Sequence, residues 1–135
     1  MSKYVDRAKE LRPDGPFHYT CCSATLVPFA EDLGLPEETL RRLGTNFAGG
    51  ERRGATCGAV AAGLMLLGLF GIDDPLITAD YYNRLKANHD GYLDCADLLR
   101  INKEKGGAKK PHCDAMVFEC VDLAETMLKE IGVLK

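Results

Sequence analysis

The stretch CGAVAAGLMLLGLF, residues 57–70, decides the fold expected for this chain of 135 residues. It is apolar all round rather than along one stripe, and a helix without a polar face must be buried on most sides. Thr56, which precedes it, is a favourable helix cap, and Gly71, which follows it, is a typical helix stop. We therefore expect a central buried helix, whose small residues would let neighbouring helices approach closely.

Amphipathic helices are predicted on both sides of this central segment. The clearest pattern covers residues 111–131, where apolar residues recur at helical spacing. A kink is expected at Pro28, because proline removes an internal hydrogen bond. Further helices are expected at residues 2–11, 20–33, 36–43, 75–88 and 94–99. The sequence thus predicts a single all-α domain over residues 1–135, a compact bundle of about five to seven helices around the buried apolar helix.

Composition and charge exclude several classes of protein. The formal net charge is −3, which does not fit a nucleic-acid-binding domain. The N-terminus lacks the apolar core of a signal peptide, and the longest apolar run is too short for a bilayer. Lysines cluster at residues 103–110 beside Gly106 and Gly107, and we expect a solvated loop there rather than an anion site. We expect a cytoplasmic protein with no nucleic-acid partner and no membrane insertion.

Six cysteines are unusual in a cytoplasmic chain, where thiols are kept reduced. Four of them fall near predicted helix N-termini, where unpaired N–H groups and the helix dipole favour a thiolate and should lower its pKa. These four candidate site residues are Cys22, Cys57, Cys95 and Cys113. Cys120 lies in mid-helix on an apolar face and is expected to be a packed core residue. Cys21 lies off the apolar stripe of its helix, and its role stays open.

Several chemistries fit four such thiolates. They could hold an iron–sulfur cluster, most simply a [2Fe–2S] unit, or cycle between dithiol and disulfide without any cofactor. They could also bind structural zinc, with His112 or His18 in place of one cysteine. A further alternative is a helical interaction or assembly module, such as a homodimer, in which the cysteines are merely packed. No CxxC pair is present, so spacing alone does not decide whether the four meet.

The chain also resembles the family of small redox-active proteins named for its cysteine signature, C_GCAxxG_C_C, from about residue 19 to the C-terminus. Cys22-Ser23-Ala24 matches the first family cysteine, and residues 47–50 with Thr56-Cys57-Gly58-Ala59 match the glycine-rich lead-in and the second. Cys95 and Cys113 match the third and the fourth.

One position departs from the family pattern. Where the family has a glycine three residues after the alanine of Gly-Ala, this chain has Ala62, and Gly63 follows it. We interpret this as a change in packing. The resemblance implies an oxidoreductase-like redox protein that transfers electrons or exchanges thiol and disulfide through its four cysteines, with a redox partner protein that the resemblance does not identify.

Overall fold

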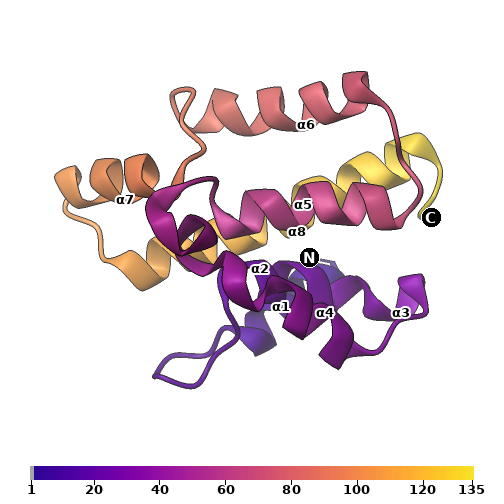
Figure 1. Ribbon diagram of the computed structural model, residues 1–135, viewed down its shortest axis with the longest axis horizontal. Helices are drawn as coiled ribbons and strands as arrows, with labels where there is room; N and C mark the ends of the chain where they lie inside the picture. Colours follow the sequence, from indigo (N-terminus) through magenta and orange to yellow (C-terminus); the bar gives the residue numbers. More distant parts are fainter. Residues whose placement is uncertain (1) are drawn as a thin grey trace.

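The computed structural model describes residues 2–135, which form helices joined by short 3₁₀ segments and loops (Figure 1). Within that range the only β-type pairing is one isolated bridge between Thr56 and Asp94. The predicted all-α class is therefore confirmed. The helices are α1 (Lys3–Leu11), α2 (Cys21–Leu26), α3 (Ala30–Leu33), α4 (Glu37–Gly44), α5 (Gly58–Leu69), α6 (Pro75–Asn88), α7 (Cys95–Glu104) and α8 (Lys109–Ile131).

Helix α5 is the centre of the bundle, as the apolar run predicts. It packs against α2 and α8, and Figure 1 shows α5 and α8 running side by side, with α1 to α4 on one side and α6 on the other. Val60 and Leu66 on α5 are fully buried. Neither α5 nor any other helix in residues 2–135 is long and apolar enough to cross a bilayer.

Gly63 of α5 allows the contact with α6. The Tyr81 ring of α6 lies directly against Gly63, and a Cβ at that position would overlap the phenol. The buried Tyr81 hydroxyl donates a hydrogen bond to the carbonyl oxygen of Val60 at 2.8 Å. Gly63 thus serves a specific packing contact between α5 and α6.

Local chemistry accounts for several helix ends. The side chains of Ser2 and Thr20 accept backbone hydrogen bonds at the starts of α1 and α2, and Asp74 does the same for α6. Pro28 lies in a 3₁₀ segment, Val27–Phe29, that separates α2 from α3. The kink predicted at this proline is confirmed. Gly34, in the left-handed region with φ 67°, ends α3.

The glycine-rich segment before α5 forms an unusual left-handed turn. Gly49 and Gly50 have φ 64°, and the next two residues, Glu51 and Arg52, have φ 60° and 61°. Left-handed backbone costs roughly 1–2 kcal/mol for each residue with a side chain. A hydrogen bond of 2.9 Å from the Ala55 N–H to the Gly50 carbonyl oxygen closes the turn. The turn leads the chain into Cys57.

Candidate thiol site

Four helix starts bring cysteines to one small cavity of about 40 Å³, which we call the thiol cavity. Cys21 is the first residue of α2, Cys57 is the residue that precedes α5, and Cys95 is the first residue of α7. Cys113 lies in the second turn of α8, which begins earlier than predicted, at Lys109. The lining of the thiol cavity comprises Cys21, Gly49, Cys57, Gly58, Cys95, Leu98, Leu99, Lys109, His112, Cys113 and Met116.

The isolated bridge fixes Cys57 beside Cys95. The Cys57 N–H donates to the Leu93 carbonyl oxygen at 2.9 Å, and the Cys95 N–H donates to the Ala55 carbonyl oxygen at 2.7 Å. These two bonds tie the start of α5 to the start of α7, although 38 residues separate the two cysteines in the sequence (95 − 57). The bridge also explains why Thr56 does not cap α5 as predicted: Thr56 pairs with Asp94, and Cys57 takes the capping position without a side-chain bond.

Gly58 makes room for Cys21. A Cβ built on Gly58 would lie 2.6 Å from the Cys21 sulfur and 2.7 Å from the carbonyl oxygen of Phe47. Both distances are far below ordinary van der Waals contact, so only glycine fits without displacement of its neighbours. The Cys-Gly pair at residues 57–58 therefore has two effects: Cys57 supplies one thiol, and Gly58 leaves space for the thiol of Cys21.

A half-buried ion pair joins the remaining two segments. The Arg12 side chain, only 5 % exposed, donates to Asp114 of α8 at 2.7 Å and to the carbonyl oxygen of Tyr19 at 2.6 Å. Lys110 donates to the other oxygen of Asp114 at 2.8 Å and to the Arg12 carbonyl oxygen at 3.1 Å. Although burial alone would raise it, these hydrogen bonds hold the pKa of Asp114 below its usual range. The network locks the approach to α2 onto the start of α8, the two elements that carry Cys21 and Cys113.

The structure places three of the four predicted site residues on the thiol cavity, and the fourth elsewhere. Cys57, Cys95 and Cys113 line it, whereas Cys22 is fully buried in the core and does not. Its neighbour Cys21 lines the cavity in its place. The predicted apolar stripe put Cys22 toward the core, and that orientation is the reason it turns away from the cavity. Cys120 is fully buried, as expected.

The expected lowering of the thiol pKa values is wrong. Burial raises the pKa of Cys57 to about 12, although backbone N–H groups at the start of α5 act in the opposite direction. Burial also raises the pKa of Cys95 and of Cys113, and it raises that of Cys22 to about 12. Loss of hydration thus outweighs the favourable field of the helix termini.

All six cysteines are free thiols in this structure. Four of them, Cys21, Cys57, Cys95 and Cys113, line the thiol cavity, so its sulfurs are all reduced. After burial, a charge on Cys21 contributes to the raised pKa of its three cavity neighbours, and it does the same for the core thiols Cys22 and Cys120.

The site does not present a ready set of metal ligands. Among the side chains of residues 2–135, no group of three or more Cys, His, Asp and Glu is arranged so that it could hold one metal ion. The histidines offered as substitute zinc ligands lie apart: His112 lines the thiol cavity, while His18 contacts Arg12 and Tyr19. The described residues therefore do not fit a bound metal ion or cluster at the thiol cavity.

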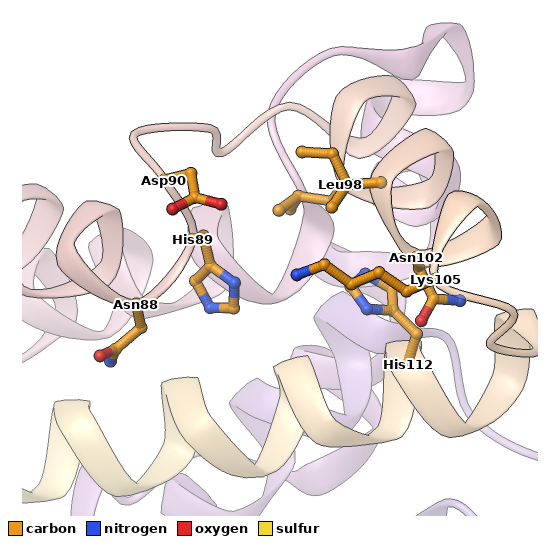
Figure 2. Close-up of a pocket in the computed structure, with 8 residues that line it drawn as sticks. Asn88, His89, Asp90, Leu98, Asn102, Lys105 and His112 are labelled. Atoms are coloured by element: carbon orange, nitrogen blue, oxygen red, sulfur yellow. The ribbon is translucent and has the colours of Figure 1, made fainter.

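A second cavity, of about 130 Å³, lies next to the thiol cavity (Figure 2). Leu98 and His112 line both. Its other lining residues are Asn88, His89, Asp90, Ile101, Asn102 and Lys105. We call it the histidine pocket. Sequence reasoning did not find it, because its polar residues are single side chains scattered over α6, α7, α8 and the loops that follow α6 and α7.

Comparison with known families identifies the family of the chain. The family model described as "Putative redox-active protein (C_GCAxxG_C_C)" matches residues 19–127, a span that contains all four cysteines of the thiol cavity. Comparison with curated proteins and with solved structures gives no match. The family match covers most of the chain and begins just before Cys21. The chain belongs to the redox-active C_GCAxxG_C_C family.

Proposed function

We propose that this protein is a thiol–disulfide redox protein whose reacting groups are Cys21, Cys57, Cys95 and Cys113. One observation carries the proposal: four free thiols, in the first turns of three helices or just before them and in the second turn of α8, line one cavity. Chance packing of cysteines in a core has no reason to collect them at helix termini beside a cavity. The proposal uses Cys21 in place of Cys22, which has no access to the cavity.

The reaction is a two-electron exchange with the disulfide of a redox partner. A cavity thiol loses its proton, and the thiolate attacks one sulfur of the partner disulfide and releases the other as a thiolate. A second cavity thiolate then attacks the mixed disulfide, which yields a disulfide within the protein and a second free thiol on the partner. The protein loses two electrons and two protons, and the partner disulfide gains both. The reverse sequence reduces the protein again.

The buried state of the thiols controls this reaction. Because burial raises the pKa of Cys57, Cys95 and Cys113, few of them are thiolates at neutral pH. The thiols should therefore react slowly with disulfides unless a partner is bound. The partner must supply a group that accepts the thiol proton, or a positive charge that stabilises the thiolate. Such a site resists indiscriminate oxidation.

The test is a redox titration of protein purified without oxygen. Free thiols are counted by alkylation and mass spectrometry after equilibration with glutathione buffers of stepped potential, and iron, sulfide and zinc are measured on the same sample. We expect thiols to disappear in pairs and to return on reduction. Cys21→Ala should disturb this titration, and Cys120→Ala should leave it unchanged.

Other results would overturn the proposal. Stoichiometric iron and sulfide with visible absorption would assign the thiols to an iron–sulfur cluster. Stoichiometric zinc, with unfolding on chelation, would assign them to a structural metal site. A thiol count that stays constant over the whole range, with an unchanged homodimer or partner complex in every cysteine variant, would leave an assembly module with packed cysteines.

A further inference from the structure

The histidine pocket carries one exposed cationic group, Lys105, and one histidine ring, His112, that no side chain of the described chain satisfies. Within residues 2–135, neither the Lys105 amino group nor the His112 ring has a hydrogen-bond or ion-pair partner. Figure 2 shows the Lys105 side chain extending toward the space between His89 and His112. Glu119, the acidic group that contacts His89, is already engaged: it accepts from His89 at 2.8 Å and from the Asn88 amide at 3.1 Å. Donors are therefore left over, as in a site for an anionic group.

The pocket also holds one acceptor of opposite charge. Asp90 lies on the far side of His89 from α8 in Figure 2, and within the described residues its carboxylate has no partner. Asp90 has φ 53°, a left-handed conformation that is uncommon for a residue with a side chain. Lys105 and Asp90 thus offer a cation and an anion across one cavity. This pairing suits a ligand that carries a carboxylate and an ammonium group.

The size and place of the pocket point to the rest of the ligand. A cavity of about 130 Å³ accommodates an amino acid, since one water needs only ~10–15 Å³ on this measure. Leu98 and His112 form a wall shared with the thiol cavity, and they stand in the chain close to Cys95 and Cys113. A ligand held by its polar end in the histidine pocket can therefore direct a sulfur-bearing end toward the thiols.

We propose that the histidine pocket binds the zwitterionic end of an amino-acid disulfide and presents its sulfur to the thiol cavity. The proposal rests on the thiol–disulfide function and names its substrate class. Lys105 and His112 donate to the carboxylate, and Asp90 accepts from the ammonium group. A cavity thiolate attacks the bound disulfide and releases one amino-acid thiol. A second cavity thiol releases the other, so the substrate gains two electrons and two protons and the protein forms one disulfide.

Binding is tested with an analogue that has no reactive sulfur. S-methyl-L-cysteine is titrated into the reduced full-length protein while the imidazole C–H signals are followed by NMR. We expect saturable shifts of His89 and His112, with His18 as an internal control that does not move. Lys105→Gln should weaken the apparent Kd about tenfold, the loss expected for one charge-assisted hydrogen bond. Lys103→Gln, in the last turn of α7 and outside the pocket, should leave it unchanged.

Reaction is tested with three disulfides of differing charge. Cystine carries both charged groups, cystamine lacks the carboxylates, and 2-hydroxyethyl disulfide lacks both. Protein thiols should react fastest with cystine, and Lys105→Gln should remove this preference while keeping the rate with 2-hydroxyethyl disulfide.

The outcomes separate the two proposals. Equal rates with all three disulfides, or histidine shifts that Lys105→Gln leaves unaltered, would overturn the substrate assignment and keep the thiol–disulfide function. Saturable binding of S-methyl-L-cysteine without any reaction of the protein thiols with a disulfide would overturn the thiol–disulfide function. The pocket would then bind amino acids but would have no role in presenting a disulfide substrate.

Discussion

Substitution of Gly58 by alanine is the sharpest perturbation of the thiol cavity, because the added carbon has no place to go. It would sit 2.6 Å from the Cys21 sulfur and 2.7 Å from the Phe47 carbonyl oxygen, about 1 Å inside ordinary contact distances. The sulfur belongs to a short side chain that can rotate. The carbonyl belongs to the backbone, so the turn that carries Phe47 must move.

The magnitude follows from two opposing contributions. Overpacking of this kind costs about 1–3 kcal/mol. The higher helix propensity of alanine returns up to ~1 kcal/mol, and less at a helix start than in its interior. We therefore expect Gly58→Ala to lower the free energy of unfolding by about 1–2 kcal/mol and to push the Cys21 thiol away from Cys57.

The matched control lies on the same helix. Gly68 has a helical backbone, and a Cβ added to it would meet no atom within 4 Å, so Gly68→Ala should be neutral or stabilising by up to ~1 kcal/mol. Urea unfolding of the reduced proteins measures the difference, and site-resolved alkylation reports Cys21, which should react faster in Gly58→Ala. The reasoning is refuted if the two variants are equally stable and Cys21 reacts alike in both.

Three further predictions concern the cysteine pair at residues 21–22, the ion pair of Arg12 and the raised pKa of Cys57. Cys21→Ala should leave an odd number of cavity thiols, so that only one pair can be oxidised in each chain, while Cys22→Ala should keep the wild-type thiol titration and cost roughly 1–2 kcal/mol for the space left in the core; thiol counting and urea unfolding check both. Arg12→Met removes the buried partner of Asp114, which keeps Lys110, and should destabilise the fold by about 1–3 kcal/mol, whereas Arg7→Met, which removes an exposed pair with Glu37, should cost no more than ~1 kcal/mol by the same unfolding assay. Burial raises the pKa of Cys57 from 9.0 to about 12, so its alkylation at pH 8 should be about a thousandfold slower than that of an unperturbed thiol and should rise with pH. The unfolded chain releases this proton first, so the stability tied to it is intact below about pH 9 and is lost between pH 9 and 12, which unfolding measured over that range will show.

Local patterns predicted the helices well where short-range chemistry decides them. Helix α6 has the predicted bounds, Pro75–Asn88, because Asp74 and Pro75 give an unambiguous start. Helix α7 extends beyond the predicted Leu99 to Glu104, and α8 begins at Lys109 rather than Pro111. The run of lysines and glycines between them indicated a loop, yet proline in the first helical turn has no intrahelical N–H bond to lose.

Long-range contacts account for what local patterns could not show. Pairing of Thr56 with Asp94 displaces the predicted cap, and no local signal predicts a bridge across 38 residues (94 − 56). Helical periodicity placed Cys22 on the core face correctly, but it could not show that the thiol cavity opens on the side of α2 that carries Cys21. The usable signal was that Cys21 lies off the apolar stripe, at the boundary between core and surface where cavity walls form. The predicted lowering of the thiol pKa values was wrong for the same reason, because the extent to which each thiol is buried depends on the whole fold.

Mapping the disulfides formed by the intact protein tests the central claim most directly. Reduced protein is exposed to limiting oxidised glutathione, trapped with acid and alkylating agent, and digested for mass spectrometry. The account predicts cross-links confined to Cys21, Cys57, Cys95 and Cys113. Cross-links that include Cys22 or Cys120, or no cross-link within a single chain, would contradict it.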